Sequence, residues 1–253
     1  MRVLFLGNNW VGWQALQWLR GAGADVVGLV LHPEGKARHD AELRAATALP
    51  QSAVFRGDAL GDPAVLRRIA ELGADVALSV FFGFILKPEF LGLFPGGTIN
   101  LHPALLPYNR GSYPNVWSIV DGTPAGVTLH WVDRGVDTGP IIAQRQVGVE
   151  PIDTGETLYR KLERASLALL EETWPAIAAG AAPAVPQPPA VGTSHRTRDV
   201  DRIDEIDLDR PTTARAVIDL LRARTFPPFR GAHFRAGGRK VLVRVQLDYD
   251  DEA

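Results

Sequence analysis

The chain begins with MRVLFLGNNWVGWQALQWLRGAGADVVGLVL (Met1–Leu31), in which two apolar patterns alternate. Residues 2–7 form a compact apolar run rich in branched side chains, which predicts a buried strand stopped by Gly7. Residues 11–23 space their apolar side chains as one face of a helix does, and glycines end the run. A second apolar run, DVVGLVL, follows at 25–31. Two apolar strands joined by a helix predict a parallel strand–helix–strand unit.

The same alternation continues as far as residue 102. DPAVLRRIAELG predicts a short helix capped by Asp62, with Pro63 in its first turn. DVALSVF and GTINLH predict two further strands. We therefore expect an α/β fold with a doubly wound, mainly parallel sheet. The first strand-to-helix turn, GNNWVG, lacks the middle glycine of a dinucleotide-binding fingerprint, so this fold does not by itself indicate NAD.

The pattern changes after Gly122. Two β-rich runs flank the loop DRGVDTG (Asp133–Gly139). A helix is then expected from about residue 154 to residue 179, with Asp153 or Thr154 as its cap.

The remainder of the chain predicts a small appendage. A Pro- and Ala-rich stretch can continue neither helix nor sheet, and it predicts a linker over residues 181–193. A charged segment, a helix and a hairpin turning at Gly237-Gly238 follow it. We expect a main, catalytic domain over residues 1–180 and a small C-terminal α+β domain over residues 194–253.

The composition is that of an ordinary globular protein, since 46% of the 253 residues are hydrophobic and 22% are charged. A net charge of −2 provides no general attraction to nucleic acid or to a membrane. Because the chain has no cysteine, disulfides, cysteine-bound zinc and thiol nucleophiles are excluded. The opening apolar run is too short for a signal peptide or a membrane span. We expect a cytoplasmic protein.

Asn100 and His102 lie two positions apart at the end of the predicted strand GTINLH, so their side chains point to the same face. That end of a parallel strand is where open α/β sheets bind ligands. The pair could equally be structural, with His102 satisfied by a backbone partner and Asn100 capping the next turn. Strand geometry alone does not decide between the two.

The loop DRGVDTG favours the functional interpretation. It carries two carboxylates among glycines, and glycines let a backbone approach a ligand closely. A carboxylate beside an imidazole orients the ring and favours its protonated form. An amide, an imidazole and a carboxylate together suit chemistry at a carbonyl, where the amide donates to the developing oxyanion.

Two other kinds of site fit the sequence poorly. His102, His130, Asp133 and Asp137 could be counted as metal ligands, but their spacing matches none of the common zinc patterns, and we expect no metal. A serine hydrolase is also disfavoured, because the chain has no Gly-x-Ser-x-Gly elbow.

The ordered pattern NLHPALLPYNRG, then PAGVTLHWVDRGVDTGP, resembles the formyltransferases that use N10-formyltetrahydrofolate. The resemblance extends over at least residues 1 to about 180 and implies a Rossmann-like formyltransferase core. It implies Asn100, His102 and Asp137 as the catalytic residues. It further implies that the folate is held at the loop FFGFIL and beside the Asp-Thr-Gly loop. The folate-binding residues expected on this basis are Phe82, Gly83, Phe84, Ile85, Asp133, Gly135 and Val136.

Members of that family differ in the amine that they formylate. LLPYNRGSYPNVWSI and the C-terminal segments are most similar to the sugar N-formyltransferases. The tRNA enzymes carry a long, basic C-terminal domain, whereas the charges of this C-terminal segment nearly balance. The resemblance therefore implies a dTDP- or UDP-linked amino sugar, of the dTDP-amino-dideoxyhexose type, as substrate. Its expected binding residues are Lys87, Tyr108, Asn109, Arg110 and Tyr113.

Several alternatives stay open at this point. Arg110 could instead donate to loop carbonyls, and Lys87 could be a solvated residue at a helix start. The acceptor could be methionyl-tRNA, an amino acid of secondary metabolism, or water in a formyltetrahydrofolate hydrolase. The chain could also be a folate-binding module without activity. Several members of the family dimerise through the region that corresponds to TFPPFRGAHF, so we expect a homodimer. We expect no binding to nucleic acid or to a membrane.

Overall fold

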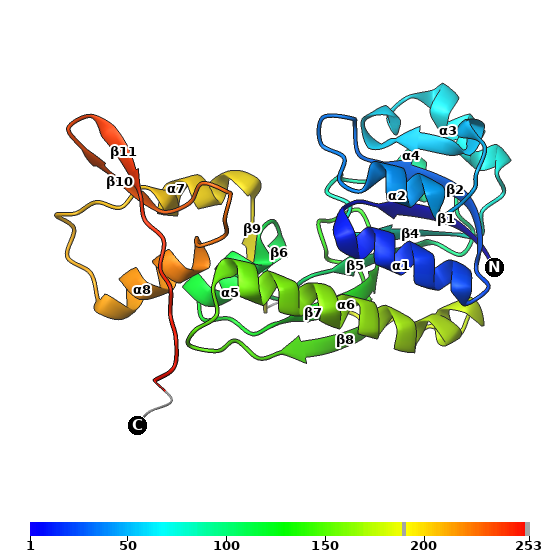
Figure 1. The fold of residues 1–253 in the computed structure, drawn as a ribbon. Helices are drawn as coiled ribbons and strands as arrows, with labels where there is room; N and C mark the ends of the chain where they lie inside the picture. The colour runs from blue at the N-terminus through cyan, green and yellow to red at the C-terminus, as the bar shows by residue number, and fades with distance from the viewer. Residues whose placement is uncertain (189–190, 251–253) are drawn as a thin grey trace. The chain divides into compact units, whose positions relative to one another are not determined.

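The structure, a computed structural model, describes residues 1–188 and 191–250. Its main feature is a seven-stranded sheet of order β3-β2-β1-β4-β5-β7-β8 (Figure 1). The strands are β1 (Arg2–Gly7), β2 (Asp25–Leu31), β3 (Val54–Arg56), β4 (Val76–Val80), β5 (Thr98–His102), β7 (Ala125–Trp131) and β8 (Ile141–Val147). The pairs from β3 to β5 are parallel, and β5 pairs with β7 antiparallel. The mainly parallel, doubly wound α/β fold expected from the sequence is confirmed.

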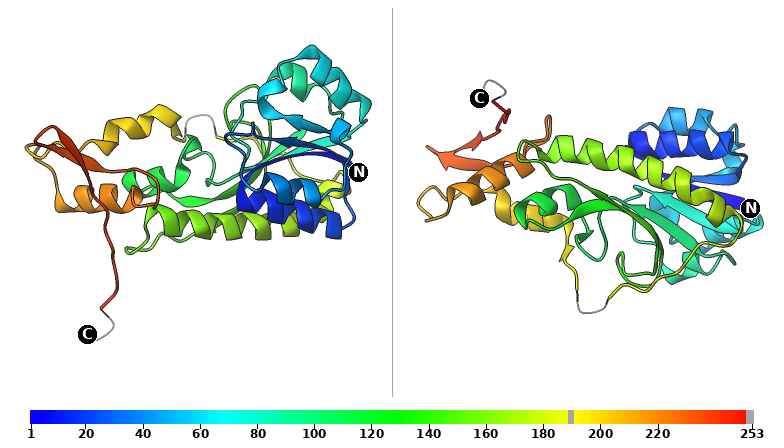
Figure 2. Two further views of the ribbon diagram at one scale, coloured as in Figure 1. Left: turned by 45° about the horizontal axis from the view of Figure 1, so that its top comes forward. Right: turned by 90° about the horizontal axis from the view of Figure 1, so that it is seen from below.

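The described residues form eight α-helices. They are α1 (Asn9–Gly21), α2 (Asp40–Ala45), α3 (Pro63–Glu71), α4 (Pro88–Leu91), α5 (Pro114–Val120), α6 (Gly155–Ala178), α7 (Asp201–Asp204) and α8 (Ala214–Ala223). α1 lies on one face of the sheet and α3 on the other (Figure 2). The Asp62 carboxylate accepts the backbone N–H of Ala64 at 2.7 Å, as expected of a cap. At α6 the cap is Thr154, whose hydroxyl accepts from the Thr157 N–H at 3.2 Å.

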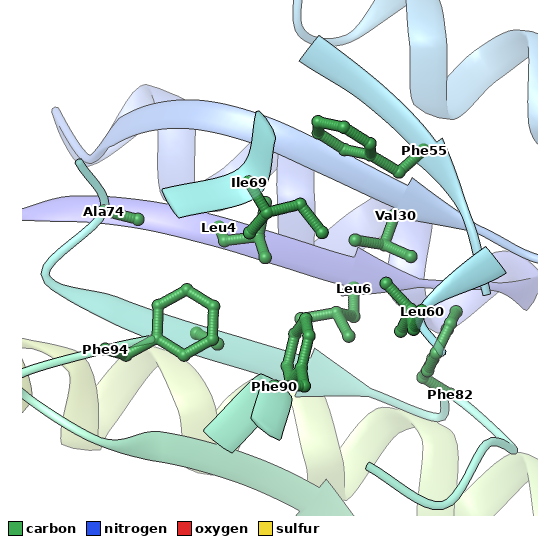
Figure 3. Packing of buried hydrophobic residues seen from close by; sticks show 11 residues of the cluster. Leu4, Leu6, Val30, Phe55, Leu60, Ile69, Ala74, Phe82, Phe90 and Phe94 are labelled. Atoms are coloured by element: carbon green, nitrogen blue, oxygen red, sulfur yellow. The ribbon is translucent and has the colours of Figure 1, made fainter. Parts of the chain in front are cut away.

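One hydrophobic cluster fills the face of the sheet below α3 and α4 (Figure 3). Leu4 and Leu6 point into it because alternate residues of β1 face the same side. The rings of Phe90 and Phe94 meet edge to face with centroids 5.0 Å apart. The buried members are Leu4, Leu6, Val30, Phe55, Leu60, Ile69, Ala74, Ala77, Phe82, Phe90 and Phe94. This packing fixes the strand ends from which the loops of the candidate site emerge.

The chain divides into two compact units. The first comprises Met1–Pro103, Val127–Arg145 and Arg164–Gln187, and it contains most of the large sheet. The second comprises Ala104–Gly126, Gln146–Glu163 and Pro188–Ala253. The domain boundaries expected from the sequence, at residues 180 and 193, stay predictions, and residues 189 and 190 of the expected linker lie outside the described residues.

The second unit holds two small sheets. β6 (Arg110–Gly111) pairs parallel with β9 (Ser194–His195). β10 (His233–Ala236) and β11 (Arg239–Leu242) form the antiparallel hairpin expected at Gly237-Gly238. A short 3₁₀ helix lies at Thr197–Val200 in this unit, and two others lie at Gln51–Ala53 and Gly57–Ala59 in the first unit. Among the described residues, no helix combines the length and the apolar composition that crossing a membrane requires.

Phe90 should be essential to the stability of the first unit because its side chain is completely buried. We expect Phe90→Ala to lower the free energy of unfolding by about 3–5 kcal/mol. Ile85→Ala, at a side chain that is 80% exposed, is the control and should change it by less than about 0.5 kcal/mol. Urea titration followed by circular dichroism measures both. Equal effects of the two substitutions would contradict the described core.

Candidate active site

Asn100 and His102 lie on β5, where the two-residue period of a strand points both side chains to one face. The register of β5 with β4 sets Ser79 beside Asn100, and its register with β7 sets His130 on the other side. Residues paired in this way share a face of the sheet. The strands therefore bring a hydroxyl, an amide and an imidazole into one row.

The Asn100 side chain has a defined orientation in this row. The Ser79 hydroxyl donates to Asn100 Oδ1 at 2.9 Å. Asn100 Nδ2 lies 3.2 Å from Nε2 of His130 and 3.4 Å from Oδ1 of Asp137. Because the amide oxygen is held by Ser79, the two N–H groups point toward the histidine and the carboxylate.

His130 completes the support of this amide. Its Nδ1 lies 2.8 Å from the carbonyl oxygen of Trp131, which can only accept, so Nδ1 carries a proton. In the neutral ring, Nε2 is then the acceptor that the Asn100 N–H requires. The side chain is only 2% exposed. From the sequence, His130 was counted only among possible metal ligands, and its contact with Asn100 was not predicted. The alternation of VTLHW does place His130 on the same face as Thr128.

Asp137 lies between the two histidines. Its Oδ2 is 3.7 Å from Nε2 of His102, and its Oδ1 is 3.5 Å from Nε2 of His130. Both distances are longer than that of an ordinary hydrogen bond. The expected catalytic residues, Asn100, His102 and Asp137, therefore do lie together, and all belong to the first unit.

The loop that carries Asp137 is braced from within. Oδ1 of Asp133 accepts from the backbone N–H of Gly135 at 2.9 Å and from the Thr138 hydroxyl at 2.7 Å. A Cβ at Gly139 would overlap the carbonyl oxygen of Trp131, so only glycine fits there. Among the residues expected to bind folate in this loop, Asp133 and Gly135 maintain the turn, and Val136 leaves 47% of its surface exposed.

The second loop expected to bind folate, Phe81–Leu86, follows β4. Phe82 belongs to the hydrophobic cluster, whereas the Ile85 side chain projects from the surface. His32 supports the loop, because its Nε2 accepts from the backbone N–H of Gly83 at 3.4 Å and its ring meets those of Phe82 and Phe84 edge-on. Burial, and to a lesser extent the charge of Lys36, lowers the pKa of His32.

The residues expected to bind the acceptor differ in exposure. Tyr113 is exposed, and Tyr108 and Arg110 are half-buried. Lys87 is exposed at the start of α4, in the first unit. Asn109 is only 1% exposed, which leaves it almost no surface for a ligand in this conformation.

Asn109 instead fixes the loop in which it lies. Its Nδ2 donates to the hydroxyls of Ser118 at 2.9 Å and Thr123 at 2.8 Å. Its backbone N–H donates to the Thr193 hydroxyl at 2.8 Å. The side chain therefore orders residues 108–113. The predicted contacts to the acceptor stay Lys87, Tyr108, Asn109, Arg110 and Tyr113.

The strand β9 also holds this loop, because it pairs with β6 at Arg110 and Gly111. Gly111 has φ +90°, and a Cβ there would meet the carbonyl oxygen of His195. The His195 ring stacks on Trp117 with centroids 4.0 Å apart and planes 8° from parallel. Its Nε2 lies 3.2 Å from a carboxylate oxygen of Asp121. Within residues 1–188 and 191–250, no group of three or more His, Cys, Asp or Glu side chains is arranged to hold a metal ion.

Residues 1–173 match the family described as Formyl transferase, and residues 199–249 match the N-formyltransferase dimerization C-terminal domain. A methionyl-tRNA formyltransferase of Symbiobacterium thermophilum is 35% identical over 98% of this chain and 76% of its own length. A dTDP-4-amino-4,6-dideoxyglucose formyltransferase of Mycobacterium tuberculosis is 37% identical over 75% of this chain and 81% of its own length.

Two solved structures extend these matches. A 4-N formyltransferase from Francisella tularensis superposes with a TM-score of 0.82 and 25% identity over 98% of both chains. A formyltransferase from Anoxybacillus kamchatkensis superposes with a TM-score of 0.58 and 30% identity, over 80% of this chain and 89% of its own. The latter was solved in complex with UDP-4,6-dideoxy-4-formamido-L-AltNAc and tetrahydrofolate.

The contact between His130 and the Trp131 carbonyl predicts one tautomer of the neutral ring. We expect the proton on Nδ1, because the carbonyl oxygen can only accept a hydrogen bond. Long-range ¹H–¹⁵N correlation spectra at alkaline pH distinguish the two ring nitrogens. Assignment of the proton to Nε2 would contradict the orientation of Asn100 described above.

Proposed function

The chain belongs to the formyl transferase family, and from that premise we propose that it formylates the primary amine of a nucleotide-linked amino sugar. The formyl donor is N10-formyltetrahydrofolate. The observation that carries this proposal is the convergence of Asn100, His102 and Asp137 at the end of β5. The proposed location of the reaction is the cytoplasm.

The donor would lie against the two loops that flank this convergence in the first unit. Ile85 and Val136 expose large apolar side chains there, and a pterin ring system offers an apolar face to cover them. The backbone of these loops supplies the polar contacts. A tetrahydrofolate bound to the related enzyme of Anoxybacillus kamchatkensis supports this assignment of the co-substrate.

In the reaction, the neutral amine attacks the formyl carbon, and a C–N bond forms while the carbonyl oxygen becomes an oxyanion. The Asn100 N–H and the protonated imidazole of His102 stabilise that oxyanion. Asp137 keeps His102 oriented and helps to accept the proton that the amine loses, directly or through a water. The bond to N10 of the folate then breaks, N10 takes up a proton, and tetrahydrofolate and the formamide are released.

Preorganisation of the donors is the main contribution of the fold. Ser79 and His130 hold the Asn100 amide before the substrate arrives, and the N–H on the side of Asp137, where the contact is long at 3.4 Å, is the one that donates to the oxyanion. The site is largely buried, which strengthens each electrostatic interaction within it.

One relative is a methionyl-tRNA formyltransferase, as its name states. That similarity makes methionyl-tRNA the second candidate acceptor. A tRNA surface requires a basic stripe, and the acidic and basic residues of this C-terminal segment nearly balance. The 37% identity to the dTDP-4-amino-4,6-dideoxyglucose formyltransferase of Mycobacterium tuberculosis favours the sugar.

We also propose that the enzyme works as a homodimer. Residues 199–249 match a dimerization domain, and this segment contains the hairpin of β10 and β11. Val241 and Leu242 of β11 are exposed apolar side chains, which an association of two copies would cover.

Substitution of the three catalytic residues tests the proposal. Asn100→Ala, His102→Ala and Asp137→Ala should each lower kcat by about 10²–10⁴-fold, because each removes a group that acts in the transition state. Product formation is followed by mass spectrometry, and thermal melts show that the variants remain folded. Near-normal turnover by all three folded variants would refute the assignment.

The acceptor is identified by assaying the wild-type enzyme with formylfolate and separate acceptors. The panel contains dTDP- and UDP-linked amino sugars, methionyl-tRNA and no amine. Formylation of a nucleotide-linked sugar supports the proposal, whereas formylation of methionyl-tRNA alone supports the second candidate. Steady release of formate without any amine would identify a hydrolase instead.

A further inference from the structure

The segment expected to be a passive linker contacts both ends of the loop that carries Asp137. The Trp131 indole N–H donates to the carbonyl oxygen of Pro183 at 3.0 Å. Val185 and Ile141 exchange two backbone hydrogen bonds, of 2.7 and 2.9 Å. Residues 183–185 thus contact the last residue of β7 and the first residue of β8, and all of these residues belong to the first unit.

Gln187 contacts the centre of the same loop. Its Nε2 donates to the carbonyl oxygen of Asp137 at 2.9 Å and to that of Gly139 at 2.8 Å. A primary amide has two N–H donors, and both are used on carbonyl groups two residues apart. The Gln187 side chain therefore fixes the Asp137–Thr138 and Gly139–Pro140 peptide planes.

The backbone at Asp137 needs such support. Its φ is +53°, in the left-handed region that residues other than glycine rarely adopt. The bonds from Asp133 order the part of the loop around Gly135 and the Thr138 side chain, but they do not reach the carbonyl of Asp137. Oδ2 of Asp137 lies 3.7 Å from Nε2 of His102. Because the side chain follows its backbone, a rotation of that peptide plane would move the carboxylate away from the imidazole.

We propose that the Gln187 side chain is a positioning residue for Asp137, and that the backbone of residues 183 and 185 braces the two ends of its loop. Gln187 touches no reacting atom. It holds the left-handed turn in which the Asp137 carboxylate faces His102. This inference rests on the proposed function, since it assumes that Asp137 takes part in formyl transfer.

The test compares three full-length variants. Gln187→Ala removes both hydrogen bonds and should lower kcat about tenfold while the KM for formylfolate changes less than twofold. Gln187→Glu keeps the shape of the side chain but cannot donate when ionised, so its loss of kcat should be larger. Val185→Ala is the matched control in the same segment, because it keeps the backbone bonds and alters only an exposed side chain. It should retain wild-type kcat.

A double-mutant cycle separates positioning from general stability. In the Asp137→Asn background, Gln187→Ala should have no further effect on the residual turnover, because the residue acts through the lost carboxylate. Wild-type kcat in both Gln187 variants would overturn the inference. The inference would also be overturned if Gln187→Ala lowered kcat by the same factor in the wild-type and in the Asp137→Asn background. Full activity of Asp137→Asn would instead overturn the proposed function, which keeps the two failures distinct.

Discussion

The hydrogen bond from the Ser79 hydroxyl to the Asn100 amide oxygen is the constraint on which the site depends. It exists because β4 and β5 are paired in one register, and a slip of one residue would turn Asn100 to the opposite face. With the oxygen held, the N–H groups of Asn100 can only point toward His130 and Asp137. The hydrophobic cluster beneath α3 and α4 includes Ala77 of β4, so core packing supports one of the two strands that form this pair.

A row of polar side chains at the end of an apolar sheet is costly unless each member has a partner. Here Ser79 and His130 pair with the Asn100 amide, Asp137 lies 3.4 Å from the nitrogen of that amide, and the Trp131 carbonyl fixes the tautomer of His130. The same contacts that remove the cost of burial also orient the groups for reaction. Structural and catalytic requirements therefore coincide at these residues.

The sequence allowed several parts of this arrangement to be predicted. The two-residue period of a strand placed Asn100 and His102 on one face, and the glycine-rich loop together with the family resemblance indicated Asp137. His130 was missed because antiparallel pairing of β5 with β7 leaves no trace in local periodicity. Gln187 was missed because it meets Asp137 fifty positions away, and a Pro- and Ala-rich composition suggests only a spacer. Asn109 was expected to contact the acceptor, which stays a prediction; that its amide orders the loop could not be predicted, because Ser118 and Thr123 meet it only in the folded chain.

The most direct test of the central constraint is the single-turnover rate of formyl transfer by Ser79→Ala. This change removes one hydroxyl from a buried strand and leaves the catalytic side chains in place. The rate should fall by about five- to tenfold with donor affinity unchanged, as expected when one hydrogen bond no longer orients the Asn100 amide. A wild-type rate in the folded variant would contradict the claim that Ser79 aims Asn100 at the reacting carbonyl.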